Sequence, residues 1–152
     1  CITSSVIKEW HRQWLGNVYA WAGLYRSVNM GKCDFQFAAA SQIDRLMQIL
    51  DRDFLARFTP CAGMNNDELA EAIAVVHVEL ILIHPFREGN GRLSRLLANV
   101  MAMQAGKPEL DFSFWDGNKE QYFSSIQAGL VDYEPMKKLV RRVLPGASTN
   151  AD

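Results

Sequence analysis

The chain has 152 residues, a net charge of −1 at neutral pH, 49% hydrophobic residues and 22% charged residues. These values favour one globular domain with a single core, and the balanced charge argues against a nucleic-acid-binding surface. No apolar run approaches the roughly 20 residues that cross a bilayer, no secretory signal is present, and cysteines 1, 33 and 61 lack metal-ligand spacing, so we expect a cytoplasmic protein with free thiols.

The N-terminal part of the chain predicts a helix followed by a β-hairpin. Residues 5–15 are amphipathic, because apolar side chains recur at helical spacing: Val6, Ile7, Trp10 and Trp14. Between residues 26 and 37 the pattern changes. The segment Asn29–Lys32 has turn chemistry and is flanked by Val28, Phe35 and Phe37, which favours a short hairpin.

The middle of the chain predicts two longer helices. Ser41 is the expected N-cap of a helix that runs to about Phe58 and ends at Thr59–Pro60. Its inward side chains are expected to be Ile43, Leu46, Met47, Leu50 and Phe54. Residues 65–67 then cap a long helix that Pro85 ends at about His84. The apolar stripe of this second helix is Leu69, Ile73, Val76, Leu80 and Ile83.

The C-terminal half predicts further helices. A tight turn at residues 89–91 leads into a helix that ends at residues 106–108, and two more helices are expected near residues 118–128 and 133–144. The tail, residues 145–152, is expected to be disordered. The whole pattern predicts one mainly α domain over residues 1–144, a compact helical bundle of about six or more helices with one short β-hairpin.

The most informative segment is the turn at residues 84–92, which reads His-Pro-Phe-Arg-Glu-Gly-Asn-Gly-Arg. Gly89, Asn90 and Gly91 stand at the start of a helix, where backbone N–H groups lack helical partners and the macrodipole is positive. The two glycines let a ligand approach the backbone closely. The turn therefore predicts an anion site, and phosphate is the usual occupant of such sites.

Two arginines strengthen this prediction. Arg92 and Arg95 lie three residues apart on one face of the first helical turns, where the dipole disfavours each cation by about 0.3–1 kcal/mol. A bound polyanion would reverse that cost, and the planar guanidinium suits phosphate oxygens. Each could instead be a solvated surface charge or the partner of a nearby carboxylate.

Glu88 and His84 complete the predicted site. A carboxylate beside bound phosphates would be repelled unless a hard cation lay between them, and Mg²⁺ commonly binds one carboxylate plus substrate phosphates. The alternative for Glu88 is a helix-start carboxylate that favours the dipole. The imidazole of His84 is a suitable general base near neutral pH. His11 and His77 lack this context, so we expect them to be buried, hydrogen-bonded histidines.

The pattern His-Pro-Phe-x-[Asp/Glu]-Gly-Asn-Gly-Arg, followed by Arg95, resembles the signature of the Fic-domain family. The resemblance extends to the segment Trp21–Arg26, which is similar to the approach to the family's hairpin "flap", and to residues 122–144, which are similar to its C-terminal helices. It implies a Fic fold and a protein adenylyltransferase, an enzyme that transfers AMP from ATP to a protein hydroxyl with Mg²⁺.

The resemblance also implies a role for each residue of the turn. His84 would deprotonate the target Ser, Thr or Tyr, and Glu88 would hold Mg²⁺. Gly89, Asn90 and Gly91 would cradle the phosphates, with help from the Asn90 side chain. Arg92 would clamp the β- and γ-phosphates, and Arg95 the γ-phosphate. By resemblance only, Asn118 and Tyr122 are candidates for the adenine pocket.

The resemblance further implies two kinds of partner. A target protein would dock on the hairpin near residues 28–37 as an added strand, although Phe35 and Phe37 could equally serve core packing. Many family members also carry an inhibitory helix, [Ser/Thr]-x-x-x-Glu-[Gly/Asn], whose glutamate pairs with the arginine equivalent to Arg95. Residues 5–9 fit its first positions, but Trp10 follows, so a missing segment, a separate antitoxin-like chain or no inhibitor are the alternatives.

Other functions stay open at this point. Family members of the Doc-like kinase branch have lysine at position 91 and transfer phosphate, so Gly91 favours AMP transfer. The same site could use another nucleotide-linked donor, or serve a silent nucleotide-binding module. The chain could also be the toxin of a toxin–antitoxin pair, and it could be delivered into another cell. No nucleic acid or membrane partner is expected.

Overall fold

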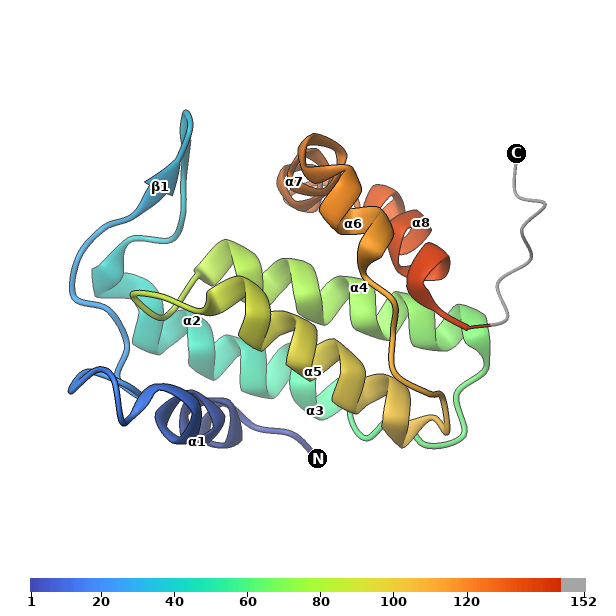
Figure 1. Ribbon diagram of the computed structural model, residues 1–152, viewed down its shortest axis with the longest axis horizontal. Helices are drawn as coiled ribbons and strands as arrows, with labels where there is room; N and C mark the ends of the chain where they lie inside the picture. Colours follow the sequence, from blue (N-terminus) through green and yellow to red (C-terminus); the bar gives the residue numbers. More distant parts are fainter. Residues whose placement is uncertain (146–152) are drawn as a thin grey trace.

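A computed structural model describes residues 1–145 and shows a helical bundle with one projecting hairpin (Figure 1). The elements are α1 (Ser4–Leu15), β1 (Gly31–Lys32), β2 (Phe35–Gln36), η1 (Ala40–Gln42), α2 (Ile43–Ile49), η2 (Leu50–Leu55), α3 (Ala56–Phe58), α4 (Asn66–Ile83), α5 (Asn90–Gln104), α6 (Ser113–Gly117), α7 (Lys119–Ala128) and α8 (Glu134–Val143). In the described part of the chain, no helix has the length and apolar character that a bilayer crossing requires.

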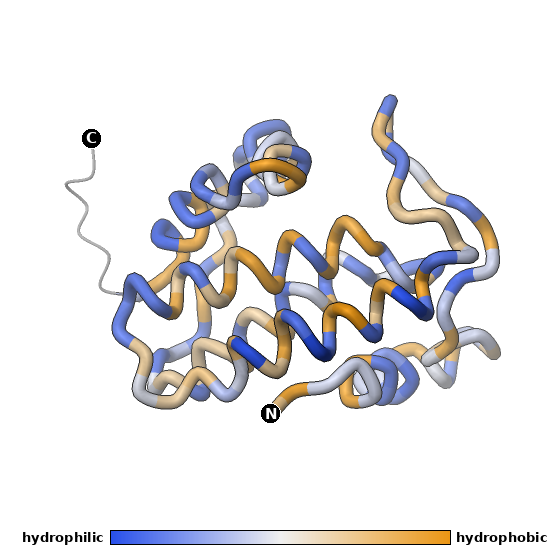
Figure 2. Tube along the Cα trace, turned by 180° about the vertical axis from the view of Figure 1, so that it is seen from behind, coloured by the Kyte–Doolittle hydropathy of each residue, from blue (hydrophilic) through white to orange (hydrophobic). Residues whose placement is uncertain are grey.

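Helix α4 is the centre of the bundle. Its start is fixed by a capping box, in which Asn65 accepts from the N–H of Glu68 and Glu68 accepts from the N–H of Asn65. The helix is buried on nearly all sides, as expected for one whose apolar residues surround its axis. Every member of the predicted stripe is buried: Leu69, Ile73, Val76, Leu80 and Ile83. Hydropathy mapped on the chain shows these hydrophobic stretches running through the central helices (Figure 2).

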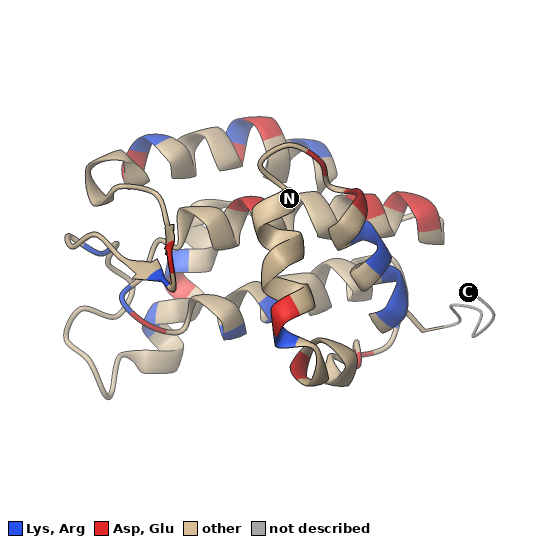
Figure 3. Ribbon diagram, turned by 90° about the horizontal axis from the view of Figure 1, so that it is seen from above, with Lys and Arg blue, Asp and Glu red and all other residues tan. Residues whose placement is uncertain are grey.

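The other helices surround α4. Helix α5 packs beside it, α8 and α7 pack across it on one side, and α2 with η2 pack on the other (Figure 1). Helix α1 lies against α5 at the edge of the bundle. Basic and acidic residues are interspersed over the helices seen from above (Figure 3), in keeping with the balanced net charge. This arrangement confirms the predicted mainly helical fold with one hairpin.

The helix predicted from Ser41 to Phe58 is broken into several parts. A 3-10 turn, η1, precedes α2, and no side chain caps either of them, so the prediction of Ser41 as N-cap is wrong. Residues 50–55 form a π-helical segment. Its wider turn changes by one position which of the later residues point toward the core. Leu55 is therefore fully buried where the pattern had placed Phe54, which is only partly buried.

The hairpin lies where it was predicted, but its turn does not. Gly31 pairs with Gln36 and Lys32 with Phe35, so the chain reverses at Cys33–Asp34 and not at Asn29–Lys32. Cys33 has a φ of 55°, the left-handed conformation that two-residue hairpin turns require. The Asn29 side chain instead accepts a hydrogen bond from the N–H of Ala40.

The C-terminal helices agree with the prediction to within a residue or two, as α7 and α8 show. Helix α6 was not predicted. It is too short to show a helical periodicity in the sequence, and Trp115 is the one buried residue within it. Residues 146–152, which hold most of the tail expected to be disordered, lie outside the described residues.

Candidate active site

The turn between α4 and α5 begins at His84. The N–H of His84 makes the last helical bond, to Leu80 O at 2.9 Å, and the residue itself is left-handed, with φ 52° and ψ 61°. For a residue with a side chain this conformation costs about 1–3 kcal/mol, and such strain clusters at functional sites. Pro85 follows and cannot continue the helix. The imidazole is thus directed by a strained backbone that the surrounding structure must hold.

The imidazole of His84 is held neutral. Its ring stacks on Phe37, with centroids 3.8 Å apart and planes within 5°. Burial, which acts most strongly, and the positive charges of Arg26 and Lys32 together lower the pKa of His84 to about 4, while the carbonyl of Ile81 acts in the opposite direction. That carbonyl does not reach hydrogen-bonding geometry, and the buried Nδ1 has no partner within residues 1–145. A neutral imidazole at physiological pH can accept a proton.

The protonation of His84 gives a direct prediction. Because its pKa is depressed, the imidazole should stay neutral as the pH falls from 8 to about 5 and gain its proton only near pH 4. The ring resonances of the free protein, followed by NMR against pH and assigned with a His84→Ala variant, measure this. A titration midpoint near the ordinary histidine value of about 6.5 would contradict this burial of the imidazole.

Asn90 holds the turn from inside. Its Oδ1 accepts from the N–H of Phe86 at 2.9 Å, and its Nδ2 donates to the carbonyl of Phe86 at 2.6 Å. Asn90 is 4% exposed and Phe86 is completely buried. The side chain of Asn90 is therefore occupied by the backbone of the turn. Its expected help to bound phosphates stays a prediction.

His11, from α1, supports the same turn from outside. Its Nδ1 accepts from the N–H of Gly23 at 2.8 Å, so Nε2 carries the proton and donates to the carbonyl of Glu88 at 3.0 Å. Its ring stacks on Phe86 at 3.9 Å. Burial lowers the pKa of His11, which suits this neutral tautomer. The prediction of a buried, hydrogen-bonded histidine is confirmed, but its link to the turn was not visible in the sequence.

The start of α5 has the backbone features that an anion cradle requires. Gly89 has a φ of 86°, and a Cβ on it would lie 2.5 Å from the ring of Trp14, so both conformation and space require glycine here. No side chain of residues 1–145 caps this helix, which leaves its first N–H groups available to a ligand. Nothing lies within 4 Å of a Cβ built on Gly91, so the space beside this position is open.

The two arginines differ in their surroundings. Arg92 is exposed, and its guanidinium lies 4.8 Å from the ring centroid of Trp14. Arg95 is partly buried and donates to the carboxylate of Asp116 at 2.8 Å, while it also lies over the ring of Phe112 at 5.2 Å. The alternative that Arg95 pairs with a nearby carboxylate is thus what the structure shows. A phosphate that binds Arg95 must compete with Asp116.

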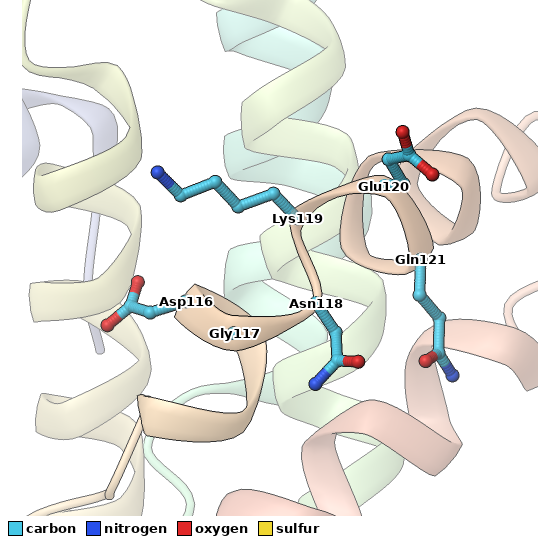
Figure 4. Close-up of a pocket in the computed structure, with 6 residues that line it drawn as sticks. All are labelled: Asp116, Gly117, Asn118, Lys119, Glu120 and Gln121. Carbon is cyan, nitrogen blue, oxygen red and sulfur yellow. The ribbon is translucent and has the colours of Figure 1, made fainter.

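An open pocket of about 600 Å³ lies beside this ion pair, lined by residues 116–121 (Figure 4). Asn118 lines it, although its Nδ2 donates to the carbonyl of Phe114 at 2.8 Å. Tyr122 is not part of the lining. Its hydroxyl lies 2.6 Å from Nε2 of His77, and burial raises its pKa. The two adenine candidates therefore separate into a pocket residue, Asn118, and a partly buried partner of His77, Tyr122.

Glu88 is exposed beside the cradle. The hydroxyl of Tyr19 lies next to it, and the pKa of Tyr19 is raised by hydrogen bonding to the Glu88 carboxylate and by its negative charge. Within residues 1–145, no three His, Cys, Asp or Glu side chains converge on a point. A divalent cation held by Glu88 would therefore take its other ligands from water or from substrate, which is the usual mode of Mg²⁺ with nucleotides.

Glu9, the one glutamate that partly fits the inhibitory pattern, does not reach Arg95. Its carboxylate bonds Arg12 and Gln13 on the exposed side of α1. Hydrogen bonding to Arg12 lowers the pKa of Glu9. In the part of the chain that the structure describes, Asp116 is the carboxylate that meets Arg95.

Comparison with known proteins finds similarity over most of the chain. Residues 1–102 match the Fic/DOC family. The chain is 32% identical over 146 residues to the protein adenylyltransferase VbhT of Bartonella schoenbuchensis, which covers 95% of this chain and 30% of VbhT. It is 34% identical over 143 residues to the protein adenylyltransferase Fic of Nematostella vectensis, which covers 93% of this chain and 32% of that protein. The chain thus spans about a third of the length of these relatives.

Solved structures show the same fold. The N-terminal FIC domain of the Bep8 protein from Bartonella sp. 1-1C superimposes with a TM-score of 0.81 at 23% identity, and the match covers 98% of this chain and 76% of that one. The BepC protein from Bartonella tribocorum, solved with bound AMPPNP, has a TM-score of 0.74 at 26% identity, with 93% and 74% covered. With the signature turn intact at the start of α5, the chain belongs to the Fic/DOC family.

Proposed function

We propose that this chain transfers AMP from ATP to a Ser, Thr or Tyr hydroxyl of a target protein. The observation that carries the proposal is the neutral imidazole of His84, which lies in the turn that leads directly into the candidate anion cradle and the arginines of α5. Relatives named protein adenylyltransferases and a structural neighbour with bound AMPPNP support it.

Each residue of the candidate site would have a separate role in the proposed transfer. The target hydroxyl attacks the α-phosphorus, its proton passes to His84, and the bond from the α-phosphorus to the bridging oxygen of the β-phosphate breaks, which releases pyrophosphate. The N–H groups at the start of α5 and the guanidinium of Arg92 bind the phosphate oxygens. Glu88 would hold Mg²⁺, which neutralises phosphate charge when bound. Positioning and charge stabilisation carry most of such a transfer.

The hairpin would present the target. The strands β1 and β2 form a two-stranded sheet whose outer edges are open to an added strand. Phe37 directly follows β2 and stacks on His84, so a segment added to the hairpin would lie near the imidazole. Phe35 packs edge-on against Phe37 and Phe123, so these phenylalanines also serve packing.

Labelled ATP tests the reaction. The protein is incubated with Mg²⁺, a cell lysate and ATP labelled in either the α- or the γ-phosphate. Label on protein from the α-phosphate alone is expected, and mass spectrometry should find added AMP. Label from the γ-phosphate alone would show a kinase instead. No label from either, with AMPPNP still bound, would point to a silent nucleotide-binding module.

Asp116 gives a second prediction. In the proposed complex Arg95 binds the γ-phosphate, but the free protein pairs it with Asp116. An Asp116→Asn variant should therefore bind AMPPNP about two- to fivefold more tightly, since an exposed ion pair of this kind is worth up to about 1 kcal/mol. Calorimetric titration measures it. Asp111→Asn is the matched control, because Asp111 bonds Ser113 and not Arg95. Unchanged or weaker binding in Asp116→Asn would count against competition for Arg95.

A further inference from the structure

Arg26 is a buried arginine whose partners are backbone carbonyls. It lies between α1 and the hairpin and is 3% exposed. Nη1 donates to Val28 O at 2.8 Å, and Nη2 donates to Ala38 O at 2.6 Å and to Ile83 O at 3.0 Å. Nε donates to His84 O at 2.6 Å. One guanidinium thus joins two segments that are far apart in sequence.

These carbonyls fall into two pairs. Val28 and Ala38 flank the two strands of the hairpin, so their carbonyls mark its base. Ile83 and His84 are at the end of α4, where carbonyls lack helical partners and the helix dipole is negative. The positive charge of Arg26 is therefore placed where the backbone attracts it, and the rigid fork of the side chain fixes the distance between both pairs.

Backbone bonds make the same connection. The N–H of Arg26 donates to Pro85 O at 2.8 Å, and the N–H of Ala38 donates to Leu82 O at 3.1 Å. Phe37, next to Ala38, stacks on the imidazole of the strained His84. Several hydrogen bonds thus connect the ends of the hairpin to the segment around His84, and Arg26 makes most of them.

We propose that Arg26 is a positioning residue, which fixes the hairpin relative to His84 so that a target segment held by the hairpin meets the imidazole in one geometry. This inference rests on the proposed function, in which the hairpin holds the target and His84 takes its proton. Arg26 touches neither substrate nor the reacting atoms in this role. It acts through the carbonyls of Ala38 and His84.

Two variants and a control test the inference. Arg26→Met removes all of the guanidinium bonds, and Arg26→Lys keeps the charge but can satisfy fewer carbonyls. Arg45→Met is the matched control, because Arg45 is exposed and its side-chain hydrogen bond within residues 1–145 is to Gln42. Circular dichroism reports folding, and binding of AMPPNP reports the cradle on α5, which Arg26 does not touch.

The readouts follow the proposed connection. In Arg26→Met, hydrogen exchange of the Phe37 and Ala38 amides should be about tenfold faster or more, because the base of the hairpin is loosened. The His84 resonances should titrate at a higher pH, since the charge of Arg26 is gone while Lys32 remains. Labelling of lysate proteins from α-labelled ATP should fall by about 100-fold, the cost of a small misplacement. AMPPNP affinity should stay within about twofold.

Comparison of the variants tests whether Arg26 positions the hairpin. Arg26→Lys should recover part of the labelling and of the slow amide exchange, and Arg45→Met should behave as the native protein. The inference is overturned if folded Arg26→Met labels lysate proteins at the native rate, or if Phe37 and Ala38 exchange as in the native protein. It is also overturned if both Arg26 variants lose AMPPNP binding together with labelling, because that shows a role in the whole fold.

The inference and the proposed function can fail separately. If the native protein labels nothing, AMP transfer is refuted, yet amide exchange and the His84 titration still show whether Arg26 fixes the hairpin. If the native protein labels lysate and Arg26→Met does so equally well, only the inference fails.

Discussion

Replacement of His84 with alanine should lower AMP transfer by about 10²–10⁴-fold, the usual contribution of a positioned general base. The imidazole is neutral at physiological pH, because burial and, second, the charge of Arg26 lower its pKa to about 4. It can therefore accept the proton of the target hydroxyl. Transfer is measured from α-labelled ATP to lysate proteins. Binding of AMPPNP should stay within about twofold, because the cradle on α5 is formed by other residues.

The backbone of His84 requires a second variant. Alanine tolerates the left-handed conformation poorly, whereas asparagine adopts it more readily, so His84→Asn separates the loss of the base from strain in the turn. Both variants should lose transfer and keep AMPPNP binding. Native activity in either one would remove His84 from the role of base.

Replacement of Asn90 with alanine should disrupt the turn itself. It leaves the buried N–H and carbonyl of Phe86 without their side-chain partner, and each unpaired group costs about 1–3 kcal/mol. We expect a lower free energy of unfolding, weaker AMPPNP binding and loss of AMP transfer together. Denaturant unfolding, calorimetric titration and the labelling assay measure the three effects.

A second asparagine on α5 is the control for this variant. Asn99 lies in the second half of the helix, and among the described residues its side chain accepts one hydrogen bond, from the N–H of Leu110 at 2.8 Å. Asn99→Ala should therefore destabilise the protein less and leave AMPPNP binding native. If Asn90→Ala keeps both nucleotide binding and transfer at native level, the side chain does not hold the cradle as its contacts imply.

The turn at residues 84–92 could be interpreted from sequence because its chemistry is local. Where a helix starts, its first N–H groups lack partners, and glycines beside them open the backbone. The structure adds what surrounds the turn. The amide of Asn90 is used by Phe86, His11 holds the carbonyl of Glu88, and Arg26 holds that of His84. None of these contacts follows from spacing, since most of their partners lie on other elements.

The errors in the fold have physical causes of the same kind. The π-helical residues 50–55 change which side chain faces the core, and a hydrophobic pattern read at 3.6 residues per turn cannot anticipate that change. The hairpin turn moved to Cys33–Asp34 because pairing of the two strands fixed the register, while Asn29, a good turn residue, found its partner at Ala40.

The sequence by itself determined the helical class, the course of α4 and α5, and the turn at residues 84–92 as the candidate site, because periodicity, capping and helix ends act within a few residues. Tertiary structure alone decided the protonation of His84, the pairing of Arg95 with Asp116 and the joining of the hairpin to the base through Arg26. These features depend on burial and on charges that folding brings together from distant segments, and the local sequence does not determine either.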